Sequence, residues 1–206
     1  KNDIGNIKNG FDSNRQATEF VNPIDLLRAP SINIDNVVIT PGQEATTICY
    51  ISIKVNSQYT ELVLVLYDQL KNQVFEIRPT LLSHSKVGDQ DESGKVFTYY
   101  LSDLDDQHVY DYYFFDAGGY SVPMTFSLPA RNQTSRLLIY GDLQGYQAEQ
   151  YEWFGNNLRQ QIGSKVDMVL LLGDIVDKGN SLEQWSYWHN AIDGIGSKIP
   201  FSTTIG

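Results

Sequence analysis

Between residues 34 and 128, apolar and polar side chains alternate with the period of two that is typical of half-buried β-strands. Residues 47–55 show it most clearly, and residues 62–67 form a short, nearly unbroken apolar run. Further strands are predicted over 72–78, 95–101, 108–115 and 123–128, with turn residues at 41–42, 88–89, 93–94, 105–106 and 118–119. About seven short strands separated by such turns predict a β-sandwich over residues 34–128.

The pattern changes after a linker at residues 129–135. Strand-like runs at 136–140, 166–172 and 199–205 alternate with two segments of helical spacing. The first segment places Tyr151, Phe154, Leu158 and Ile162 on one face and is followed by Gly163. The second begins at Ser181, which can cap it, and places Leu182, Trp185, Trp188 and Ile192 on one face. Residues 136–206 are therefore predicted to form a βαβαβ unit with a parallel sheet.

The amino-acid composition and the net charge limit the classes of protein to which this chain can belong. Hydrophobic residues make up 41% of the chain and charged residues 19%, as in globular proteins. The formal net charge of −10 argues against general binding to nucleic acid or to anionic membranes. No apolar run approaches the ~20 residues that span a bilayer. Residues 1–33 are polar and are interpreted as an arm lying on the domains, and the single cysteine, Cys49, is interpreted as a buried apolar residue.

Two predicted strands end in the same dipeptide, Gly141-Asp142 and Gly173-Asp174. Ligands of open α/β sheets bind at the carboxyl ends of the strands, and neighbouring strands lie ~4.8 Å apart. The two carboxylates can therefore converge, and a divalent cation would offset their mutual repulsion. The alternative is that each aspartate caps the loop or helix that follows it.

The strings around these dipeptides, residues 137–145 and 171–179, resemble the first two signatures of the calcineurin-like metallophosphoesterases. The preceding sandwich resembles the layout of plant-type purple acid phosphatases, in which a fibronectin-III-like domain, a relative of the immunoglobulin fold, precedes the catalytic domain. The resemblance implies that Asp142 binds a first metal ion and that Asp174 bridges two, with Gly141 and Gly173 letting the strand ends pass close to them. It further implies that residues 136–206 are the first βαβαβ half of the metallophosphoesterase domain and end before its Gly-Asn-His-acid signature.

Two positions depart from the family pattern. Gln144 stands where the family has His or Gly, and its carbonyl oxygen is a weaker ligand for Zn or Fe than an imidazole. It is either a metal ligand or a simple loop residue. Asp177 stands where purple acid phosphatases have a ligating tyrosine, and the wider family implies an outer-shell role for it. The alternative for Asp177 is a solvated charged turn.

The resulting expectation is a full-length metallophosphatase that hydrolyses small phosphorylated substrates with two ions, of Fe, Zn, Mn or Mg. Residues 1–206 alone are expected to be inactive. The alternatives are a non-catalytic relative acting as an extracellular binding or structural module, or an assembly protein dominated by its sandwich. The resemblance implies a secreted or lysosomal/vacuolar location, and Asn132-Gln133-Thr134 is a candidate glycosylation site. No chemistry is assigned to His84 or His108, and His189 is interpreted as a packing or surface residue.

Overall fold

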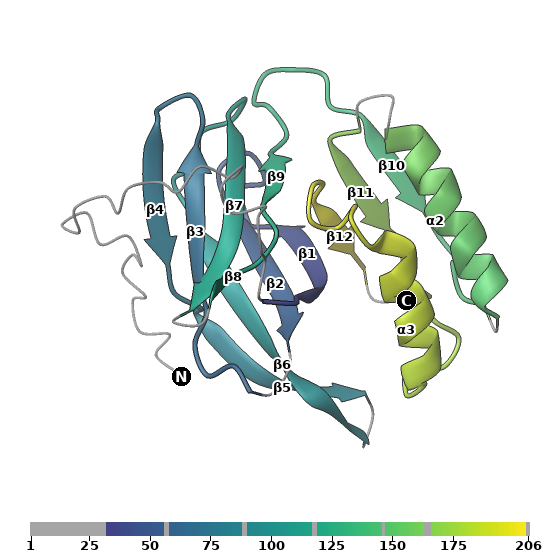
Figure 1. Ribbon diagram of the computed structural model, residues 1–206. Coiled ribbons are helices and arrows are strands. Elements are labelled where there is room, and N and C mark those ends of the chain that lie inside the picture. Colours follow the sequence, from purple (N-terminus) through teal and green to yellow (C-terminus); the bar gives the residue numbers. More distant parts are fainter. Residues whose placement is uncertain are drawn as a thin grey trace, which may run out of the picture.

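The computed structural model describes residues 32–204 except 56–57, 88–89, 117–118, 146 and 163–165. Two antiparallel sheets and a parallel sheet carrying two helices make up the described chain (Figure 1). Residues 1–31 of the arm predicted over residues 1–33 lie outside the described residues, as does the predicted helix end at Gly163. No helix among the described residues is long and apolar enough to cross a membrane.

The first antiparallel sheet has the strand order β1-β2-β6-β5, with bounds β1 Asp35–Pro41, β2 Cys49–Val55, β6 Gln90–Leu101 and β5 Leu81–Val87. The second has the order β4-β3-β7-β8, with β9 also paired to β7. Its bounds are β3 Val63–Asp68, β4 Gln73–Ile77, β7 Val109–Asp116, β8 Gly119–Tyr120 and β9 Met124–Ser127. Alternate residues of β2 are buried, and they share one apolar core with residues of β3, β6, β7 and β9. The period-two pattern thus arises because two sheets pack face to face and bury one side of each strand.

The predicted strands differ from the structure in several details. Ser93-Gly94, predicted as a turn, lies inside the long strand β6, and β1 and β5 are not among the predicted ranges. Strand β5 is at the edge of its sheet and leaves Leu81 and Leu82 exposed. An exposed edge strand is not required to alternate apolar and polar residues, so its sequence lacks the signal used to find the others. Cys49 is a core residue as expected, and burial raises the pKa of its thiol to about 12.

The parallel sheet follows the predicted order. Strands β10 Leu137–Tyr140, β11 Met168–Leu171 and β12 Phe201–Thr203 lie side by side in that order, all parallel. Helices α2 Ala148–Ile162 and α3 Leu182–Ile192 connect them. Ser181 caps α3 by accepting a hydrogen bond from the Gln184 amide at 3.3 Å, as the sequence predicts.

Aromatic side chains join the two helices to one face of this sheet. Tyr140 of β10 contacts Phe154 of α2, with ring centroids 4.9 Å apart, and Phe154 stacks on Trp188 of α3 at 5.5 Å. The opposite face is open, since Leu137, Ile139 and Leu172 are 46%, 57% and 51% exposed. The helices therefore cover one face of the sheet and leave an apolar surface on the other.

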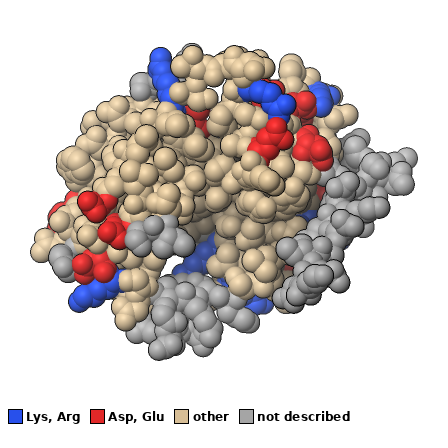
Figure 2. All heavy atoms as spheres, turned by 180° about the vertical axis from the view of Figure 1, so that it is seen from behind, with Lys and Arg blue, Asp and Glu red and all other residues tan. Residues whose placement is uncertain are grey.

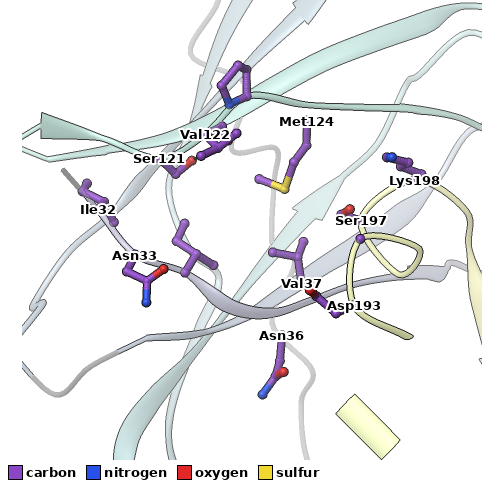
Figure 3. A pocket seen from close by; sticks show the side chains of 13 residues that line it. Ile32, Asn33, Asn36, Val37, Ser121, Val122, Met124, Asp193, Ser197 and Lys198 are labelled. Carbon is purple, nitrogen blue, oxygen red and sulfur yellow. Dashed lines mark hydrogen bonds between the residues drawn. The ribbon is translucent and has the colours of Figure 1, made fainter. Parts of the chain in front are cut away.

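Strand β1 joins the sandwich to the βαβαβ unit. The Ile39 amide donates a hydrogen bond to the Gly196 carbonyl at 2.8 Å, and the buried Tyr112 hydroxyl donates to the Ser197 carbonyl at 2.7 Å. A side chain at Gly196 would meet the Val37 carbonyl oxygen at 2.7 Å, so the loop after α3 lies directly against β1. A pocket of about 310 Å³ opens at this junction, with Met124 of β9 and Lys198 of the loop among its lining residues (Figure 3).

Candidate metal centre

The two Gly-Asp dipeptides come together at one edge of the parallel sheet. Tyr140 pairs with Leu171 at the last rung of β10 and β11, and the Leu172 amide donates to the Tyr140 carbonyl at 2.8 Å just beyond it. Asp142 lies two residues past that rung and Asp174 three residues past it, and both are exposed. The strand ends therefore present both carboxylates to solvent at the edge where α/β sheets bind ligands.

Both aspartates adopt a left-handed backbone conformation. Their φ angles are 52° for Asp142 and 48° for Asp174, and Gly173 has φ 89°. Such angles are uncommon for residues other than glycine and collect at functional sites, where the surrounding structure must hold them in place. The described hydrogen bonds include none accepted by either carboxylate, so the capping alternative has no described contact to support it. Their roles as metal ligands stay a prediction.

Gln144 is exposed and lines the same pocket as Asp142, a hollow of about 380 Å³. The other lining residues are Leu143, Glu149, Gln150, Trp153 and Phe154. The structure thus brings Gln144 and Asp142 together on one surface, and the role of Gln144 as a ligand stays a prediction. Asp177 is half-buried in the loop that follows Asp174.

The two glycines have different local requirements. A Cβ at Gly141 would approach Leu172 no closer than 3.6 Å, an ordinary contact, and Gly141 lacks a positive φ. Gly173 is buried and has the φ of 89° that side chains rarely adopt. At the strand ends themselves, the backbone therefore requires glycine at 173 and not at 141.

The loop after Asp174 is anchored to α3. The amide of Lys178 donates to Gln184 Oε1 at 2.8 Å, and Gln184 is buried. The Trp185 indole donates to the Gly179 carbonyl at 2.9 Å. These contacts fix the course of residues 178–181, so the loop that carries Asp174 and Asp177 is held at both ends.

The donor set suits a hard divalent cation. Asp142, Asp174 and Gln144 offer oxygen atoms, which Mg²⁺ and Mn²⁺ prefer, and no described lysine or arginine forms a salt bridge with either carboxylate. Exposed carboxylates that follow two neighbouring strand ends, with no cationic partner among the described residues, are a favourable environment for a metal ion. Three side chains are fewer ligands than two ions require, at about four to six each.

A second group of potential ligands lies in the sandwich. One ligand atom from each of Asp68, Asp105 and His108 falls within 4.8 Å of the others. Asp68 Oδ2 lies 2.8 Å from His108 Nδ1, Asp68 Oδ1 accepts from the Leu70 and Lys71 amides at 2.9 and 3.0 Å, and Lys71 pairs with Asp105. His108, to which no chemistry was assigned, thus belongs to a network that closes the β3–β4 turn.

Residues 135–206 match the family of calcineurin-like phosphoesterases. The family resemblance read from the two Gly-Asp strings is confirmed. The match covers the parallel sheet and both helices, and we call residues 135–206 the phosphoesterase segment. No curated protein sequence matches the chain.

Solved structures extend the comparison to the fold. The purple acid phosphatase PPD1 from seeds of yellow lupin (Lupinus luteus) aligns with a TM-score of 0.69 at 14% identity, over 85% of this chain and 35% of that protein. The structure of PhoD aligns with a TM-score of 0.49 at 11% identity, over 86% of this chain and 40% of that protein. The lupin enzyme thus shares the arrangement of sandwich and phosphoesterase segment, and this chain spans about a third of its length.

Proposed function

We propose that the full-length protein hydrolyses phosphate esters at a two-metal site built on Asp142 and Asp174. The observation that carries the proposal is the pair of left-handed aspartates at neighbouring strand ends, in a segment that matches the calcineurin-like phosphoesterases. In this proposal Asp142 would hold the first ion, Asp174 would hold both, and Gln144, which lines the same pocket as Asp142, would be a further oxygen donor. Bound divalent ions would supply Lewis acidity toward a phosphoryl oxygen and lower the pKa of a water molecule.

The residues of the chain would orient the ions and the substrate. The pocket beside Asp142 gives room for the alcohol portion of a small phosphorylated substrate, and Trp153, which is 65% exposed, lines it. An indole in that position suits an aromatic leaving group, on which it can stack. Asp177 would act from the neighbouring loop by orienting it.

The remaining ligands would come from residues outside the described part of the chain. The family resemblance predicts that they include the Asn and His of the Gly-Asn-His-acid signature. Under this proposal residues 1–206 by themselves bind metal weakly and do not turn over substrate. We further propose that residues 34–128 and 136–206 are separate domains and that the sandwich is fibronectin-III-like. The protein would be secreted or lysosomal/vacuolar, and it would have no nucleic-acid partner.

On the face shown in Figure 2, the charged side chains of the described residues form no continuous basic stripe. In the face shown in Figure 2, acidic and basic side chains of the described residues gather in small separate groups within a broad uncharged surface. A protein that tracks a nucleic-acid backbone instead presents a continuous basic stripe.

A second candidate function is a metallophosphoesterase relative without catalytic activity, acting as a binding or structural module. The observation that favours it is Gln144, which replaces an imidazole or glycine beside the first metal position. Both candidates keep the fold, and they differ in whether the metal-loaded protein turns over a phosphate ester.

An assay of the metal-depleted full-length protein separates the two. An aryl phosphate is supplied together with Mn²⁺, Zn²⁺, Mg²⁺ or iron in turn. Asp142→Asn and Asp174→Asn are each expected to lower kcat/KM by at least ~100-fold, the scale on which one charged group acts at a phosphoryl centre. Asp103→Asn is the matched control, because Asp103 is an exposed left-handed aspartate, φ 57°, on the sandwich. Wild-type protein with no metal-dependent turnover would favour the non-catalytic relative.

A further inference from the structure

A buried tyrosine hydroxyl connects the two Gly-Asp loops. Tyr151 lies in the first turns of α2 and is only 1% exposed, with its ring 6.1 Å from that of Tyr187. The Gly145 amide donates to its hydroxyl oxygen at 3.3 Å, and the Ile175 carbonyl lies 3.1 Å from the same oxygen. The Gly145 carbonyl is a second acceptor at 3.3 Å. The hydroxyl has one proton, and its shorter acceptor contact is with Ile175.

These partners belong to different loops of the candidate metal centre. Gly145 follows Asp142 by three residues, and Ile175 follows Asp174 directly. The sequence pattern shows Tyr151 only as an apolar-face residue of its helix, and its hydroxyl contacts become visible once the two loops are placed. The resulting bridge runs from the Gly145 amide through the Tyr151 hydroxyl to the Ile175 carbonyl.

The first loop is packed closely onto α2, and the Tyr151 hydroxyl stays protonated. A Cβ at Gly145 would lie 2.4 Å from Gln150 Oε1, so the first loop is packed closely onto α2. Burial raises the pKa of Tyr151, and the charge of Asp177 raises it further, against the opposing effect of the Gly145 hydrogen bond. The hydroxyl therefore keeps its proton at neutral pH and remains a donor.

We propose that Tyr151 is a positioning residue of the metal centre, which holds Asp142 and Asp174 in their left-handed conformations at a fixed separation. Left-handed aspartates persist only where tertiary contacts hold them, and Tyr151 contacts both loops that carry them. It acts through the backbone and is not itself a ligand. This inference rests on the proposed function, because it assumes that the two aspartates share a metal site.

The test is metal affinity, measured by titration calorimetry on the metal-depleted full-length protein. Tyr151→Phe keeps the buried ring and removes the hydroxyl. It is expected to lower metal affinity by ~10-fold or more, the usual effect of losing a group that orients metal ligands. Tyr187→Phe is the matched control, since the Tyr187 hydroxyl donates to Glu183 at 2.6 Å on the surface of α3. It should leave metal affinity within about twofold of wild type.

Hydrogen exchange gives a second readout that does not need metal. The Gly145 amide should exchange slowly in wild-type protein and faster in Tyr151→Phe, and it should be unchanged in Tyr187→Phe. Wild-type affinity in a folded Tyr151→Phe protein would overturn the positioning role while leaving the proposed function intact. A wild-type protein that binds no divalent metal would instead overturn the proposed function, and the positioning role with it. If Tyr151→Phe does not fold, unprotected exchange at Gly145 in wild-type protein overturns the bridge.

Discussion

Asp142 and Asp174 share one backbone conformation, with φ angles of 52° and 48°, at the ends of paired parallel strands. The same uncommon backbone conformation just beyond two neighbouring strand ends is more specific than either Gly-Asp dipeptide alone. An aspartate at a strand end can simply cap the loop that follows it. That role does not require both Asp142 and Asp174 to be left-handed and exposed. The pair therefore gives the candidate metal centre its geometric basis.

The glycines before these aspartates predict different mutational costs. Gly173→Ala should lower the free energy of unfolding by about 1–2 kcal/mol, because its φ of 89° is strained for any residue with a Cβ. Gly141→Ala should change it by less than about 0.5 kcal/mol, since the added Cβ meets only Leu172 at ordinary distance. Chemical denaturation of both variants measures the difference. Equal costs would contradict this account of the strand ends.

The Asp68–His108 contact predicts acid sensitivity of the sandwich. Burial by itself raises the pKa of Asp68, but the Lys71 amide, His108 and the Leu70 amide outweigh it and leave the pKa below its ordinary value. The stabilisation is thus fully present above the unfolded pKa of about 3.9 and is lost as the pH falls through the lower folded value. Asp68→Asn should remove this dependence below pH ~4 and cost ~1–2 kcal/mol at neutral pH.

Denaturation curves at several acidic pH values measure this dependence. Glu76→Gln is a suitable control, because Glu76 is an exposed acid on the neighbouring strand β4. An unchanged acid transition in Asp68→Asn would show that the β3–β4 turn does not depend on this carboxylate.

The sequon at Asn132 predicts glycosylation if the protein enters a secretory pathway. Asn132 is exposed with φ 61° in the connection between β9 and β10, and Thr134 is also exposed. Expression in secreting eukaryotic cells should give a product whose mass falls on treatment with a peptide N-glycosidase. Thr134→Ala is the cleaner variant, because it removes the sequon without placing another residue in the left-handed conformation of Asn132. Unmodified secreted protein would contradict the prediction.

Much of the fold could be predicted because burial imposes a period on the sequence. Cys49, Ile51 and Ile53 alternate because one face of β2 faces the core, and Tyr151, Phe154 and Leu158 recur because one face of α2 does. Strand β5 was missed because its edge position leaves Leu81 and Leu82 exposed. The turn predicted at Ser93-Gly94 was wrong because dipeptides that are favoured in turns are also tolerated inside a long strand.

The candidate site was predicted less completely. The aspartates could be found because they sit at the ends of predictable strands. The role of Tyr151 could not, because its hydroxyl contacts join residues 145 and 175, whose proximity is a property of the tertiary fold. The same reason applies to Asp68 and His108, which are 40 residues apart in sequence.

The central claim is that Asp142 and Asp174 hold metal ions together. The most direct measurement is the metal content of the full-length protein after equilibration with Mn²⁺ or Zn²⁺, by elemental analysis of wild type and the two asparagine variants. About two ions are expected per wild-type chain, about one in Asp142→Asn, and fewer than one in Asp174→Asn, the proposed bridging position. Asp103→Asn should match wild type. A metal content unaffected by both Asp142→Asn and Asp174→Asn would contradict the account.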